Sequence, residues 1–156
     1  MGIVKAGKFG FDKIRKKYMN GNTPLNVSDE VLLRRLTDIG ILLTNHARTI
    51  TKSRAEGGYD DHTGNLRSSI GFRIYKDGEI KQEGGFQSVG GTLGVEAAKE
   101  GLNTYELAHS IPINGWTIVI VAGMSYAKYV EAKGYNVLHL TNIKMREEIE
   151  KLKGKL

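Results

Sequence analysis

The chain has 156 residues and a formal net charge of +6, with 40% hydrophobic and 26% charged residues. This balance suits one globular domain with a core and excludes a disordered or collagen-like chain. The lack of cysteine excludes disulfides and thiolate chemistry, and no apolar run reaches the roughly 20 residues that cross a bilayer. We therefore expect a single domain over residues 1–156 with no membrane association.

The positive charge lies at the two ends of the chain. Residues 1–20 contain six Lys and Arg against one Asp, and residues 141–156 contain five against three Glu. We interpret 1–27 as a basic N-terminal arm, with a short helix over 8–20. The arm lacks the apolar stretch of a signal peptide, so we expect synthesis in the cytoplasm. Basic ends are typical of solvated termini, and the alternative is a contact with phosphate.

A long amphipathic helix is predicted over residues 29–54. Ser28 can cap its N-terminus, and Asp29 and Glu30 place negative charge in the first turn, where the helix dipole favours it. Its apolar residues recur at spacings of three or four: Leu32, Leu36, Ile39, Leu43, Ala47 and Ile50.

A β-hairpin follows. Ile70, Phe72 and Ile74 alternate with smaller or polar residues, the period of a half-buried strand. The pair Asp77-Gly78 indicates a tight turn, because both turn residues need positive φ. The returning strand, residues 79–83, is mostly polar and is predicted to lie at an edge of the sheet.

Residues 84–110 are predicted to be a flexible insertion. Five glycines lie between positions 84 and 94, and residues 95–107 have only partial helical character. Loops of this length inside a compact domain are usually functional or disordered. We expect the insertion and the two termini to order only on assembly.

The last elements are a buried strand over 116–122, which is almost entirely apolar, and a helix from about residue 141. Strands grouped between helices, without β-α-β alternation, predict an α+β fold. We expect a small antiparallel sheet with the long N-terminal helix and the C-terminal helix packed on one face.

No catalytic, cofactor or metal site is predicted. The glycines of 84–94 lack the Lys-Ser/Thr ending of a phosphate-binding loop, and the four histidines show no metal-ligand spacing. A small hydrolase or toxin-like enzyme is kept as an alternative. It requires His62 or His109 to meet a carboxylate in a cleft.

Two segments are more specific. The first, Thr63 to Ile70, predicts a turn, one turn of helix and entry into a strand. The second follows the buried strand and places Tyr126, Tyr129 and Val130 on one side of a short helix. We predict that Leu66, Ile70, Tyr129 and Val130 pack these short helices against the sheet; the alternative is that they lie in an interface with a partner. Arg67 is predicted to form an ion pair between segments, with Glu131 as the candidate partner.

Together these segments resemble the tail-component family of tailed bacteriophages. The residues that carry the resemblance are Thr63, Gly64, Leu66, Arg67, Ser69, Ile70, Tyr126, Ala127, Tyr129, Val130, Glu131 and Gly134. The resemblance implies a non-enzymatic virion protein that joins head to tail or completes the tail.

It also implies the partners: further copies of the chain in a ring, and other head–tail connector or tail proteins. DNA inside the virion is a further partner that the basic ends suggest. The alternative function is a nucleic-acid-binding module that uses the basic termini.

Overall fold

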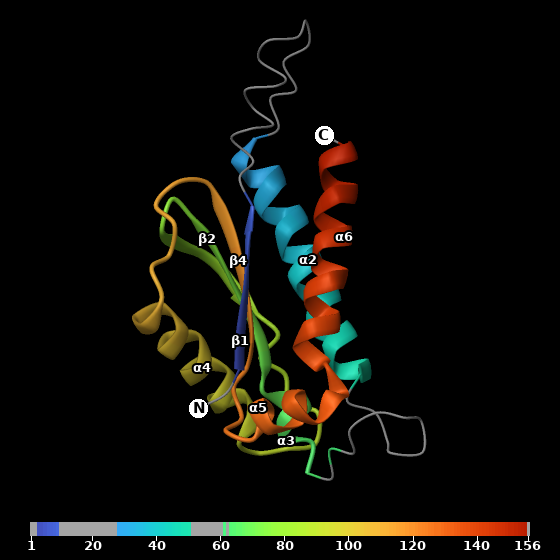
Figure 1. The fold of residues 1–156 in the computed structure, drawn as a ribbon. Helices are drawn as coiled ribbons and strands as arrows, with labels where there is room; N and C mark the ends of the chain where they lie inside the picture. The colour runs from blue at the N-terminus through green and yellow to red at the C-terminus, as the bar shows by residue number, and fades with distance from the viewer. Residues whose placement is uncertain (1–2, 10–27, 51–60, 62, 156) are drawn as a thin grey trace, which may run out of the picture.

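The structure, a computed structural model, describes residues 3–9, 28–50, 61 and 63–155 (Figure 1). In chain order its elements are β1 (Ile3–Phe9), α2 (Asp29–Ile50), α3 (Asn65–Ser68), β2 (Ile70–Lys76), β3 (Glu79–Gly84), α4 (Gly94–Ala108), β4 (Trp116–Ala122), α5 (Ala127–Val130), the π-helical turn η2 (Glu131–Tyr135) and α6 (Val137–Lys155).

The strands form one antiparallel sheet in the order β1-β4-β2-β3. Helices α2 and α6 lie side by side against one face, and α4 covers the other (Figure 1). The fold is therefore α+β, with a long N-terminal helix and a C-terminal helix packed on a small antiparallel sheet, as predicted. These two helices share one face of the sheet, as predicted, and α4 covers the other face, which the sequence did not predict.

Strand β4 lies inside the sheet, between β1 and β2, and all seven of its residues are buried. Ile118 and Ile120 pack in the larger core with α2 and α6, whereas Val119 and Val121 pack in the smaller core under α4. Because both faces are covered, apolar residues occur at successive positions rather than alternate ones. The prediction of a buried central strand is confirmed.

Helix α2 begins where the sequence predicted. The Ser28 hydroxyl accepts a hydrogen bond from the Val31 backbone nitrogen at 3.3 Å. Leu36 and Leu43 are buried against the sheet and α6, and burial of a leucine side chain contributes about 1.5–3 kcal/mol. The predicted extension of this helix beyond Ile50 lies outside the described residues.

The hairpin of β2 and β3 is also confirmed. Asp77 and Gly78 have φ of 52° and 85°, the left-handed conformation that a tight two-residue turn requires. The Asp77 carboxylate accepts a hydrogen bond from the Gly115 backbone nitrogen at 2.7 Å, which ties the turn to the start of β4. Strand β3 lies at the edge, exposed along most of its length.

The N-terminal arm contains a strand where its sequence predicted the start of a helix. Lys8 and Phe9, which the prediction placed in a helix over 8–20, lie in β1. This strand pairs with β4 in register from Ile3 opposite Ala122 to Phe9 opposite Trp116. The edge of β4 would otherwise leave backbone groups unpaired beside the core, a cost that outweighs a weak helical pattern. Residues 10–20 lie outside the described part of the chain.

The segment predicted as a flexible insertion contains α4, whose Ala98 and Leu102 are completely buried. Its glycines allow close packing: a β-carbon added to Gly123 would lie 1.8 Å from the Ala97 carbonyl oxygen, and one added to Gly94 would lie 2.4 Å from Ser68. Composition alone suggested mobility because it does not distinguish these two uses of glycine. The ordering of this segment on assembly stays a prediction.

Helix α6 begins at Val137, earlier than the predicted residue 141. Met145, Ile149 and Leu152 face the core, as their spacing predicted. Among the described residues, no helix has both the length and the apolar character needed to cross a membrane.

Candidate functional site

The structure brings the two motif segments together at one end of the sheet. The backbone nitrogen of Gly123, just after β4, donates a hydrogen bond to the Ser69 carbonyl oxygen at 3.0 Å. Ile70, the first residue of β2, pairs with Ala122, the last residue of β4. The short helices α3 and α5 therefore lie at the same end of the molecule, at the bottom of Figure 1.

The first segment is held to the loop that precedes α4. The Ser68 hydroxyl donates to the Gly64 carbonyl oxygen at 2.7 Å and accepts from the Val89 backbone nitrogen at 2.8 Å. Gly64 has φ of 71°, and a β-carbon on it would lie 2.5 Å from the Val89 oxygen. Only glycine fits there without strain. Leu66 and Ile70 are fully buried, in agreement with their predicted packing role.

Thr63 and Ser69 hold the backbone of the same segment. The Thr63 hydroxyl accepts a hydrogen bond from the Asn65 backbone nitrogen at 3.3 Å, at the start of α3. The Ser69 hydroxyl donates to the Leu66 carbonyl oxygen at 2.8 Å, at its end. Both contacts are local and structural.

The predicted ion pair between Arg67 and Glu131 is not formed. Arg67 Nε lies 3.9 Å from a carboxylate oxygen of Asp61, whose side chain is nearly buried. The same oxygen accepts a hydrogen bond from the Arg67 backbone nitrogen at 2.9 Å. Arg67 therefore interacts within its own segment rather than between segments.

Glu131 instead caps helix α6. Its two carboxylate oxygens accept hydrogen bonds from the backbone nitrogens of Leu138 at 3.1 Å and His139 at 2.7 Å. The first turn of a helix has unpaired N–H groups and a positive dipole end, so a carboxylate is well placed there. Gly134, with φ of 86°, lets the chain turn between the carboxylate and the helix. This capping lies at the start of α6, where Val137 and Leu138 already face the larger core.

The second segment has a buried side and an exposed side. Ala127 and Val130 are buried in the larger core, and Tyr126 packs against its margin. Tyr129 is 62% exposed, so its predicted packing role was wrong. The Lys133 ammonium lies 5.1 Å from the centre of the Tyr129 ring, a cation–π contact. Tyr129 is therefore the one aromatic side chain of the motif that is largely exposed to solvent.

Comparison of the chain with protein-family models, with curated proteins and with solved structures found no match.

Sequence reasoning missed Arg48, which fastens α2 to this end of the sheet. Its guanidinium donates to the carbonyl oxygens of Arg67 at 3.1 Å and Ile70 at 3.3 Å, and also to that of Gly85. Burial lowers the pKa of Arg48. The available signal was a basic residue in the last turn of a helix, which predicts only an interaction with the helix dipole.

A second missed residue is Arg73, which is 5% exposed beneath α4. It donates to Glu83 at 2.9 Å, Glu106 at 2.8 Å and Asn103 at 3.1 Å, and so joins β2, β3 and α4. The Tyr75 hydroxyl donates to the same Glu106 carboxylate at 3.2 Å. Burial raises the pKa of Tyr75 to about 12.

None of the described histidines hydrogen-bonds to Arg73, Tyr75 or Glu106. His109 stacks on Tyr105 with ring centres 4.2 Å apart, and His46 lies on α2, where burial and then Lys144 lower its pKa. His62 lies outside the described residues. In the described ranges no three His, Cys, Asp or Glu side chains come close enough to bind a metal ion.

Proposed function

We propose that this chain is a structural virion protein of a tailed bacteriophage, which joins head to tail or completes the tail by ring-like self-assembly. It is made in the host cytoplasm and ends in the virion. Its partners are copies of itself and neighbouring connector or tail proteins, and its role requires no catalytic step.

The observation that carries the proposal is the contact between the two motif segments. They are separated by more than fifty residues, yet they meet through the hydrogen bond from Gly123 to Ser69. Leu66, Ile70 and Val130 are buried, and Glu131 caps α6. If the resemblance of these two short segments were due to chance, we would not expect the segments to contact each other or their residues to stabilise the same end of the fold.

The alternative, a nucleic-acid-binding module, gains little support from α6. Its basic residues are interleaved with acids, and Lys144, Lys151 and Lys153 form ion pairs with glutamates of the same helix. Local pairing of this kind reduces the positive potential that attracts phosphate. A contact of the basic termini with DNA in the virion stays a secondary proposal.

Light scattering after size-exclusion chromatography, over a range of protein concentrations, tests the proposal. We expect an oligomer of defined mass. A parallel DNA-binding assay over a salt series separates the alternative, which predicts a monomeric complex whose affinity falls steeply with salt. A monomer that binds DNA in this way would contradict the assembly role.

A further inference from the structure

We propose that the interface between copies joins a basic aromatic patch on α5 and η2 of one subunit to an acidic stripe on α4 of the next. We call the first surface the foot patch (Lys128, Tyr129 and Lys133) and the second the α4 stripe (Glu96, Glu100 and Leu107). This inference rests on the proposed function and names the surfaces through which it acts.

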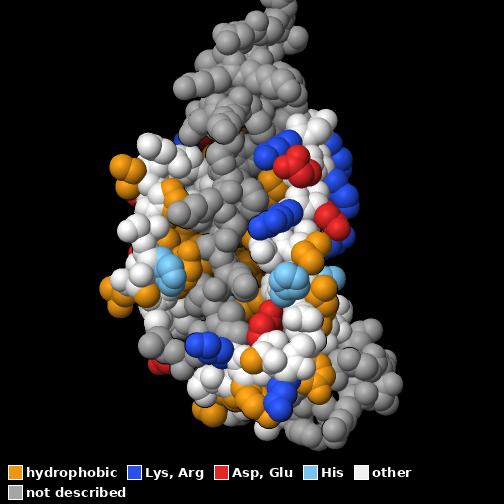
Figure 2. All heavy atoms as spheres, in the orientation of Figure 1, with side chains coloured by type: hydrophobic (Ala, Val, Ile, Leu, Met, Phe, Trp, Pro, Cys, Tyr) orange, Lys and Arg blue, Asp and Glu red, His pale blue; other side chains and the backbone are white. Residues whose placement is uncertain are grey.

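The foot patch is held rigidly but exposed. All three of its side chains are exposed, while Ala127 and Val130 of the same helix are buried. The α5 and η2 segment is tied to α6 by the two hydrogen bonds to Glu131. Figure 2 shows hydrophobic side chains gathered at the foot of the molecule with Lys or Arg side chains among them. Tyrosine is enriched among the residues that contribute most of the binding energy at protein interfaces.

The α4 stripe lies on the side of the helix opposite its buried face. Glu96, Glu100 and Leu107 are spaced by four and seven residues, which places them on one line along a helix. Both glutamates are exposed, and Leu107 is 90% exposed, more than any other large hydrophobic residue of the described chain. Lys99 points to the flank, where its ammonium lies 5.6 Å from the centre of the Phe86 ring.

A second copy is the partner that fits both surfaces. The foot patch carries two lysines and an aromatic ring, and the α4 stripe carries two glutamates and an aliphatic side chain, so charge and apolar character are complementary. They lie on different elements, so one copy can offer its foot patch to one neighbour and its α4 stripe to another. Such head-to-tail contacts generate a ring when the rotation closes.

Charge reversal with rescue tests the interface. Lys128→Glu with Lys133→Glu places acids against the α4 stripe, and Glu96→Lys with Glu100→Lys places bases against the foot patch. We expect each double variant to raise the concentration at half-assembly about tenfold or more, because like charges face each other across the contact. We expect the quadruple variant to recover most of the wild-type assembly, because opposite charges then face each other again.

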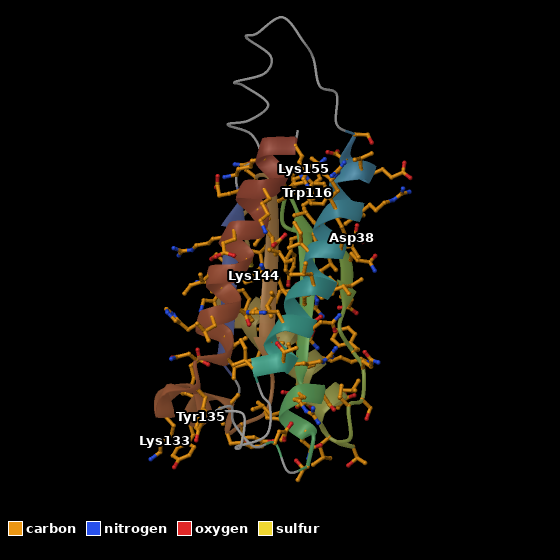
Figure 3. All side chains as sticks on the ribbon, turned by 90° about the vertical axis from the view of Figure 1, so that its right-hand side faces the viewer. Asp38, Trp116, Lys133, Tyr135, Lys144 and Lys155 are labelled. Carbon is orange, nitrogen blue, oxygen red and sulfur yellow. The ribbon has the colours of Figure 1, made fainter. Side chains whose placement is uncertain are left out.

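The matched control is Arg146→Glu with Lys155→Glu, which makes the same change of charge on α6. Lys155 and the foot residue Lys133 lie at opposite ends of the molecule in Figure 3. We expect this control to assemble like the wild type, and circular dichroism to show that every variant is folded. Equal loss in the control, or no rescue in the quadruple variant, overturns the interface but leaves the proposed function intact. A wild-type chain that stays monomeric at every concentration overturns both.

Discussion

At the scale of single residues, most residues of the two motif segments stabilise the fold. Gly64 occupies a left-handed position with no room for a side chain, and Ser68 bridges two backbone segments. Glu131 caps a helix that begins six residues later in the chain. Tyr129 differs from these residues because its ring faces solvent. A motif can therefore combine residues that stabilise the fold with one that is available for binding.

Glu131→Ala is expected to destabilise the protein by about 0.5–2 kcal/mol, the usual cost of losing a helix cap. The backbone nitrogens of Leu138 and His139 lose their acceptors, so the first turn of α6 should exchange its amide hydrogens faster than the last turn. Urea denaturation and hydrogen exchange measure these two effects. Glu150→Ala, an exposed residue of the same helix, is the control; equal effects of the two substitutions would show that the cap contributes nothing.

Tyr75 should make stability depend on pH in the alkaline range. The folded pKa is raised by burial to about 12, above the unfolded value of about 10. Below pH 10 both states keep the phenol proton, so the stabilisation is fully present. As pH rises from 10 to 12 the unfolded state releases its proton first, and stability is lost.

We therefore expect Tyr75→Phe to lose less stability than the wild type between about pH 9 and about pH 11. The denaturant midpoints of the wild type and the variant are measured at both pH values. Lysines also titrate in this range, but they do so in both proteins, so their effect cancels when the two losses of stability are subtracted. Parallel losses in both proteins would show that Tyr75 titrates normally.

At the scale of elements, the sequence predicted what depends on local pattern. The bounds of β4, the existence of β2, the Asp77-Gly78 turn, and the capped start of α2 follow from periodicity and turn chemistry. Strand β1 and the place of α4 could not be predicted in this way, because both are decided by distant parts of the chain. The same holds for Arg48 and Arg73, whose partners lie on other elements.

The backbone of Gly123 lies very close to the backbone of α4. A β-carbon there would lie 1.8 Å from the Ala97 carbonyl oxygen, so Gly123→Ala should push α4 from the sheet and cost about 1–3 kcal/mol. Hydrogen exchange should rise over residues 94–108 more than over α6. Gly154→Ala is the control, because a β-carbon there meets nothing within 4 Å. Equal exchange in α4 and α6 of the Gly123 variant would contradict this account.

At the scale of the whole molecule, the side chains packed between the sheet and its helices differ between the two faces of the sheet. The face under α2 and α6 holds the larger apolar core, and the face under α4 combines a small apolar core with the Arg73 network. Basic side chains lie along the outer edge of α6 in Figure 2. A subunit with different surfaces on different sides is suited to head-to-tail contacts, in which one surface meets another on the neighbouring copy.

Negative-stain imaging of the purified full-length protein, at concentrations where light scattering detects assembly, tests the central claim most directly. The account predicts closed rings of uniform diameter, because a fixed head-to-tail contact repeats with a fixed rotation. Particles the size of a single chain at every concentration would contradict it.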